Sequence, residues 1–110
     1  MGSVRRGDLV TIAMPGDFGK PRPALVIQSD QFTETATATV LLLSGTMVDA
    51  PLMRVEVPPS PENGLRKRSQ VMVDKVMTVK RDKLGDPFGH LSDSDMLAVN
   101  RALALFLGFA

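Results

Sequence analysis

Short apolar runs alternate along the chain with segments rich in proline, glycine and small polar residues, a pattern typical of a sheet of short strands. An uninterrupted apolar run predicts a strand buried on both faces, whereas alternation of apolar and charged residues predicts a strand with one face in water. On these grounds we expect extended segments at 8–13, 24–27, 37–43, 53–57, 69–79 and 88–91.

The run at 69–79 changes phase in its middle. Its apolar positions slip between Val73 and Val76, and Asp74 and Lys75 occupy the gap. A slip of this kind predicts a bulge or a sharp bend, and bulges often redirect side chains at functional sites.

The last segment carries the signals of a helix. Ser92 is a candidate N-cap with Asp95 three residues later, and Gly108 is the expected stop. The apolar positions recur at helical spacing, at Met96, Val99, Leu103 and Phe106. One terminal helix after several short strands predicts a single α+β domain over 1–110, mostly antiparallel, with the helix packed on a small barrel-like sheet.

Composition excludes several classes of protein. The 110 residues include no cysteine and one histidine, which excludes a disulfide framework, a thiolate zinc site and a cysteine nucleophile. The acidic residues are scattered, so we expect no metal and no other cofactor. No apolar run reaches the roughly 20 residues that span a bilayer, so we expect no membrane partner. The absence of cysteine fits the reducing cytoplasm.

Positive charge is concentrated in one part of the chain. The net charge is only 13 − 12 = +1, but residues 63–83 hold seven basic and two acidic side chains. Such a stretch can bind a phosphate backbone. It is also compatible with a solvated sheet edge whose lysines prevent aggregation.

The chemistry that remains available is that of arginine, hydroxyl and carboxylate groups at strand ends. Such a set can cleave RNA without a metal, because the 2′-OH of RNA is an internal nucleophile. The enzyme must then deprotonate that hydroxyl, stabilise the charged transition state and protonate the leaving oxygen. Composition permits this function but does not select it.

Several motifs along residues 5–108 favour RNA cleavage more strongly than composition does. They lie at 6–10 (Arg-Gly-Asp-Leu-Val), 22–27 (Arg-Pro-Ala-Leu-Val-Ile), 44–46 (Ser-Gly-Thr), 64–76 and 89–92 (Gly-His-Leu-Ser). Together they resemble the MazF/PemK-type toxins of type II toxin–antitoxin systems. The resemblance implies an SH3-like barrel of the CcdB/PemK type with a C-terminal helix. It also implies a homodimer that is a sequence-specific, metal-independent endoribonuclease for single-stranded RNA, leaves a 2′,3′-cyclic phosphate, and is inhibited by an antitoxin with an acidic C-terminal tail.

The resemblance also implies roles for individual residues. Arg22 would be the catalytic or phosphate-holding arginine, Ser44 or Thr46 would supply a hydroxyl near the scissile phosphate, and Asp74 matches an aspartate proposed as a base in some members. The residues expected to bind RNA are Phe18, Lys20, Arg66, Lys67, Arg68 and Lys75.

Simpler interpretations stand beside these roles. Ser44 and Thr46 are also suited to closing a turn, Asp74 to a structural Asx-turn, and Phe18 to anchoring its loop. The segment 15–21 lacks the glutamate that the family usually carries there, which leaves the general acid and base open.

Two other functions remain as alternatives to RNA cleavage. One is a gyrase-poisoning, CcdB-like toxin without nuclease activity, and the other is a non-catalytic SH3-like interaction module. An Arg-Pro strand start at Arg22 with hydroxyls at the end of the neighbouring strand favours the endoribonuclease.

Overall fold

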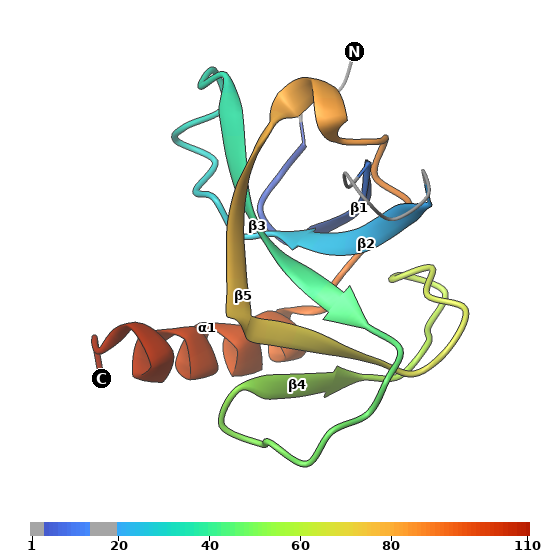
Figure 1. Cartoon of the computed structure of the whole chain (residues 1–110), viewed down its shortest axis with the longest axis vertical. Helices are drawn as coiled ribbons and strands as arrows, with labels where there is room; N and C mark the ends of the chain where they lie inside the picture. The colour runs from blue at the N-terminus through green and yellow to red at the C-terminus, as the bar shows by residue number, and fades with distance from the viewer. Residues whose placement is uncertain (1–3, 14–19) are drawn as a thin grey trace.

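The computed structural model describes residues 4–13 and 20–110. Within these ranges six strands form one antiparallel sheet with the order β4-β5-β3-β2-β1-β6, followed by one helix (Figure 1). The elements are β1 (Asp8–Ala13), β2 (Pro21–Val26), β3 (Thr37–Ser44), β4 (Arg54–Val57), β5 (Ser69–Lys80), a 3₁₀ turn (Arg81–Lys83), β6 (Gly89–His90) and α1 (Asp93–Leu107). The predicted α+β, mostly antiparallel class is confirmed.

A bend in β5 curls the sheet into a half-barrel. In its pairing with β3, Leu41 lies opposite Val76 but Leu43 lies opposite Val71. Residues 72–75 of β5 therefore face the single residue Leu42 of β3. Figure 1 shows β5 turning sharply, so that its two halves run in different directions. This is the bend that the phase slip at Asp74 predicts.

Both faces of the central strands are buried, which explains their uninterrupted apolar runs. Along β3, Leu41 and Leu43 belong to one apolar cluster, while Val40 and Leu42 belong to a second cluster on the opposite face. Because successive side chains of a strand point to opposite faces, burial of both faces over 40–43 requires an apolar residue at each of these positions.

The helix is capped as its sequence predicts. The Ser92 hydroxyl accepts a hydrogen bond from the Asp95 N–H at 3.1 Å, and Gly108 ends the helix at a left-handed φ of 86°. Val99 and Ala102 are buried against the sheet, but Phe106 is 46% exposed. The predicted apolar stripe is thus covered only in part. Among the helices described, none has the length and apolar character needed to cross a membrane.

The strand β2 begins at Pro21, three residues before the predicted start. Pro21 and Pro23 pair with β1, but the pairing of β2 with β3 ends at Ala24 and Leu42. Proline has no backbone N–H to donate to a neighbouring strand. It is tolerated here because one side of this part of β2 has no neighbouring strand. The gap between β2 and β3 that results is where the site lies.

Candidate functional site

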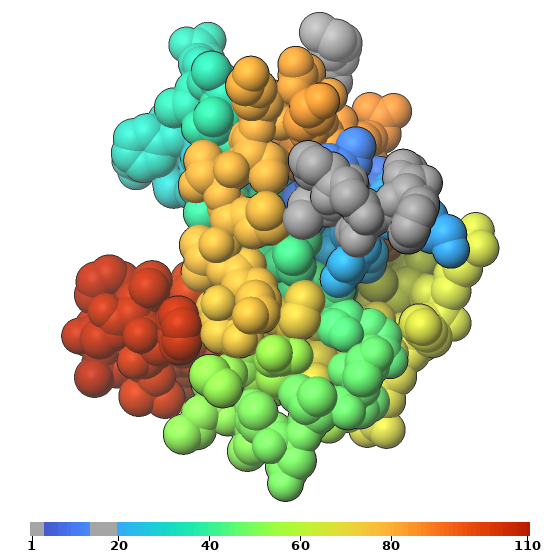
Figure 2. Space-filling model, viewed as in Figure 1, coloured from blue at the N-terminus to red at the C-terminus, as the bar shows by residue number. Residues whose placement is uncertain are grey.

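A groove of about 790 Å³ opens where β2 and β3 part. Its walls come from β1, β2, the end of β3, the segment before β5 and the residue before β6. Figure 2 shows this face, with β2 in blue, the segment after β3 in green and the segment before β5 in yellow. The lining residues are Thr11, Pro21, Arg22, Pro23, Leu43, Ser44, Gly45, Thr46, Gly64, Leu65, Arg66, Lys67, Ser69 and Phe88.

This groove brings together five of the predicted site residues from three separate segments. Arg22 comes from β2, Ser44 and Thr46 from the end of β3, and Arg66 and Lys67 from the segment before β5. Of the described residues that line it, three are cationic and none is acidic. An arrangement of guanidinium, ammonium and hydroxyl groups without carboxylates fits an anionic ligand such as a phosphate.

The strand register places Arg22 and Ser44 at facing positions. The last pair of β2 and β3 is Ala24 with Leu42. In an antiparallel pair the partner numbers have a constant sum, so the same register continued by two residues sets Arg22 opposite Ser44. Arg22 on β2 and Ser44 on β3 therefore lie on opposite sides of the gap, where the two strands begin to part.

The Ser44 hydroxyl is held in place by the turn that follows β3. Its Oγ accepts a hydrogen bond from the Thr46 N–H at 3.0 Å. Its contact as a donor to the Thr46 carbonyl is long, at 3.4 Å, and correspondingly weak. The turn-closing role is therefore real for Ser44, and it also fixes the hydroxyl oxygen while leaving its proton available to a ligand.

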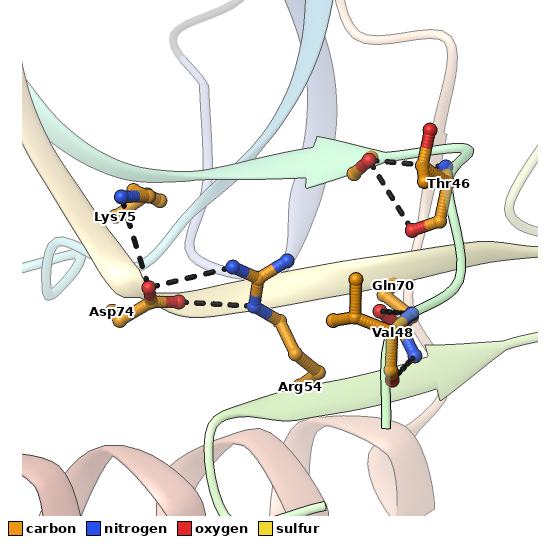
Figure 3. Close-up of polar contacts among 7 residues, drawn as sticks. Thr46, Val48, Arg54, Gln70, Asp74 and Lys75 are labelled. Carbon is orange, nitrogen blue, oxygen red and sulfur yellow. Dashed lines mark hydrogen bonds and ion pairs between the residues drawn. The ribbon is translucent and has the colours of Figure 1, made fainter. Parts of the chain in front are cut away.

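The loop after Thr46 is anchored from below by Gln70, which is 2% exposed. The Gln70 amide donates to the Val48 carbonyl at 2.9 Å and accepts from the Val48 N–H at 3.2 Å (Figure 3). These two bonds satisfy the buried amide and attach the loop to β5. They therefore support the turn formed by Ser44, Gly45 and Thr46, the hydroxyl turn.

The opposite wall of the groove is organised by Asn63, a residue whose role the sequence analysis missed. Asn63 is 3% exposed. Its Oδ1 accepts from the N–H groups of Ser60 and Leu65 at 3.0 and 2.9 Å, and its Nδ2 donates to the Pro58 carbonyl at 2.9 Å. These bonds hold the proline-rich loop in one shape. The Asn-Gly pair in the sequence signals a turn, but not a buried hub.

Lys67 reaches across the groove to the hydroxyl turn. A Cβ atom on Gly45 would collide with the Lys67 side chain, so this lysine lies directly over the backbone between Ser44 and Thr46. The Lys67 ammonium group therefore lies next to the hydroxyl turn, although its backbone belongs to the opposite wall of the groove.

Asp74 lies outside the groove lining, at the bend of β5. Arg54 Nε donates to Asp74 Oδ1 at 3.1 Å, and Lys75 Nζ lies 3.8 Å from Asp74 Oδ2 (Figure 3). The side chains of Arg54 and Asp74 are only 16% and 17% exposed. Lys75 is likewise directed to this ion pair.

The other residues predicted to bind RNA also lie apart from the groove. Arg68 Nε pairs with Glu56 of β4 at 2.8 Å, with both side chains in solvent. Lys20 is exposed just before β2 and does not line the groove. Phe18 falls outside the described residues.

Thr11, Ser69 and Phe88 line the groove without having been predicted. The Ser69 hydroxyl donates to the Lys67 carbonyl at 3.1 Å and so supports that wall. No sequence signal marks Thr11 or Ser69, whereas an aromatic residue beside Gly89 marks Phe88 weakly. Among residues 4–13 and 20–110, no cluster of three or more His, Cys, Asp or Glu side chains is placed to hold a metal ion.

Known proteins are similar to this chain over nearly its whole length. A probable endoribonuclease MazF from Mycolicibacterium smegmatis is 46% identical over 108 residues, which cover 97% of this chain and 99% of that relative. The endoribonuclease EndoA of Bacillus subtilis is 28% identical, with 94% of each chain covered. A solved mycobacterial endoribonuclease in complex with its cognate antitoxin has a TM-score of 0.79 at 26% identity, with 97% of each chain covered.

The family assignment rests on the whole domain. The model of the PemK-like, MazF-like toxins of type II toxin–antitoxin systems matches residues 5–107. That span includes every strand, the groove and the helix. The chain therefore belongs to the PemK-like, MazF-like toxin family.

Proposed function

We propose that this chain is the toxin of a type II toxin–antitoxin pair and a sequence-specific, metal-independent endoribonuclease that cleaves single-stranded RNA in the groove between β2 and β3. One observation carries this proposal. Arg22 and the Ser44 hydroxyl, which the Thr46 N–H holds in place, both line the groove. Two further cationic side chains line it as well, and its described lining includes no acidic side chain. That is the set of groups needed to hold and polarise a phosphodiester.

The reaction is a transesterification within the RNA. The 2′-oxygen attacks the adjacent phosphorus, the bond to the 5′-oxygen of the next nucleotide breaks, and a 2′,3′-cyclic phosphate remains. The 2′-OH loses its proton and the leaving 5′-oxygen gains one. Negative charge builds up on the non-bridging oxygens, so preorganised donors that face them lower the barrier most.

Arg22 and Ser44 supply these donors. The Arg22 guanidinium is suited to two parallel hydrogen bonds with the phosphate, and it keeps its positive charge throughout. The Ser44 hydroxyl donates its proton to the same group in place of its long contact with the Thr46 carbonyl, while its oxygen stays bonded to the Thr46 N–H. Thr46 itself is exposed beside it and has the lesser role.

Arg66 and Lys67 hold the phosphates that flank the scissile bond. Both are exposed on the wall that Asn63 organises, and Lys67 crosses to the hydroxyl turn. Asp74 acts through the shape of β5 rather than as a base, because its carboxylate is engaged by Arg54 away from the groove lining.

The exposed apolar side chains of α1 give the surface for a homodimer. Four large apolar side chains of α1 are each between 46% and 54% exposed: Leu97, Leu105, Phe106 and Leu107. A second copy of the chain would cover them, as the family resemblance implies. An antitoxin with an acidic C-terminal tail would compete with RNA for the cationic groove, and both encounters would take place in the cytoplasm.

RNA cleavage in excess EDTA tests the proposal against its alternatives. The wild-type protein should cleave single-stranded RNA, and Arg22→Ala should lose about 10²-fold or more in rate. Arg22→Lys, which keeps the charge but not the bidentate geometry, should recover only part of that loss. Intact RNA together with inhibited DNA supercoiling by gyrase would support the gyrase poison instead, and no effect on either would support an interaction module.

A further inference from the structure

The groove contains an aromatic side chain that the mechanism above does not use. Phe88 lines it beside Leu65, at the wall opposite the hydroxyl turn. Of the aromatic residues within the described ranges, Phe88 alone lines this groove, and Phe32, Phe106 and Phe109 are exposed elsewhere. We propose that Phe88 stacks on one nucleobase of the RNA and so holds the strand in register, an inference that rests on the endoribonuclease function proposed above.

The backbone of Phe88 is fixed on both sides. Its N–H donates to the Leu9 carbonyl of β1 at 2.9 Å. Its carbonyl oxygen lies 2.6 Å from the place where Gly64 would carry a Cβ, and a Cβ on Gly89 would collide with the Asn63 carbonyl. Two glycines thus let the loop that Asn63 organises pack directly against the backbone around Phe88.

The ring is partly packed and partly open. Its Cδ1 lies 3.3 Å from the Cβ position of Gly64, while the residue as a whole keeps 38% of its surface exposed. An aromatic ring that is already held in one place loses little conformational freedom when a ligand stacks on it. This is the arrangement expected of a binding platform rather than of a side chain buried in the core.

The distribution of charge around the ring identifies the ligand group. Arg22, Arg66 and Lys67 provide cationic contacts for phosphates, whereas Phe88 and Leu65 form an apolar part of the same lining. Single-stranded RNA presents both kinds of group, because its bases are free to turn away from the backbone and stack on aromatic side chains. A phosphate in the cationic part therefore leaves a neighbouring base to occupy the apolar part.

An abasic scan tests this stacking. A short RNA with one cleavage site is prepared with a single abasic nucleotide at each position in turn, and kcat/KM is measured for wild type, Phe88→Leu, Phe88→Trp and Phe32→Ala. In wild type, one position should show a loss of about 5- to 150-fold when its base is removed. Phe88→Leu should show a loss of that size on the intact RNA and almost no further penalty at that position.

The control variants separate stacking from packing. Phe88→Trp keeps an aromatic face and should retain the positional penalty, whereas Phe88→Leu keeps an apolar side chain beside Gly64 but has no such face. Phe32→Ala removes an aromatic residue that is 55% exposed outside the groove and should cleave like wild type. Melting temperatures of all variants show whether each one folds.

Two results would overturn the inference. One is a Phe88→Leu protein that cleaves intact RNA like wild type, and the other is a positional penalty that persists undiminished in that variant. Affinities for 2′-deoxy versions of the same strands, which lack the nucleophile, are measured in parallel and should show the same pattern. If wild type binds the 2′-deoxy strands with this pattern but does not cleave RNA, the proposed function is refuted and the stacking inference stands.

Discussion

Arg54 Nε donates a hydrogen bond to Asp74 Oδ1 at 3.1 Å, across the point where β5 bends. The pair joins β4 to β5 in a place where both side chains are more than four-fifths buried. Residues 72–75 leave the ladder with β3 at this point, although Met72 still pairs with Arg54 of β4. The ion pair therefore links β4 to β5 beside the break in the β3 ladder.

Asp74→Asn should therefore lower stability rather than catalysis. Loss of the carboxylate charge from a largely buried, charge-assisted hydrogen bond costs about 1–3 kcal/mol in the free energy of unfolding, measured by urea denaturation. Cleavage per folded molecule should stay within a few-fold of wild type. Glu56→Gln is the matched control, because its pair with Arg68 is exposed and such pairs contribute about 0–1 kcal/mol. A 10²-fold or larger loss of cleavage with unchanged stability would return Asp74 to the role of a base.

Ser44→Ala should reduce kcat more than Thr46→Val does. Removal of one preorganised donor typically costs about 10²–10³-fold, and the Ser44 hydroxyl is the one that the turn fixes. Thr46→Val keeps the N–H that orients Ser44, so its rate should fall by less than about tenfold. Single-turnover cleavage of one RNA by both variants makes the comparison. The reverse order of effects would assign the site hydroxyl to Thr46.

The salt dependence of RNA binding should separate neighbouring basic residues. For single strands, the slope of log Kobs against log salt is about −0.7 for each phosphate contact. Arg66→Gln combined with Lys67→Gln should therefore make the slope shallower by about 1.4. Arg68→Gln should leave the slope nearly unchanged, since that guanidinium pairs with Glu56. An equal change in the two proteins would show that the groove does not select among these side chains.

The dimer should depend on the exposed face of α1. Wild type should scatter light as a dimer at micromolar concentration, and Leu105→Glu combined with Phe106→Glu should be a folded monomer. Leu52→Glu introduces a single glutamate at a 71%-exposed position of the β3–β4 loop and should remain dimeric. A wild-type protein that is strictly monomeric under these conditions would remove the dimer from the account.

Much of the fold follows directly from the sequence. Burial on both sides of β3 requires an apolar residue at each position of 40–43, and the bend of β5 appears as a break in the pattern of apolar positions at Asp74. The two caps of α1 are local as well, because Ser92 accepts from the Asp95 N–H at the start and Gly108 ends the helix in a left-handed conformation, so both can be predicted. The exposure of Phe106 cannot, because it depends on how far the sheet extends along the helix.

The site was predictable only in part, because its walls are set by tertiary contacts. Lys67 and Arg68 are neighbours in the sequence, yet the first crosses the groove to Gly45 and the second turns to Glu56 on β4. The family motifs point to Arg22 and Ser44, but no local pattern reveals that Asn63 is a buried hub, and the position of Phe88 beside Gly89 indicates only weakly that its side chain faces the groove.

In the proposed reaction, the groove directs a 2′-oxygen onto the adjacent phosphorus without a metal. A DNA strand with a single ribonucleotide at the cleavage position tests this most directly, in excess EDTA and with analysis of the product ends. We expect one cut, 3′ of the ribonucleotide, a 2′,3′-cyclic phosphate on the 5′ fragment, and no cleavage of the all-DNA strand. Cleavage of the all-DNA strand, a 3′-hydroxyl product, or activity that requires added magnesium would contradict it.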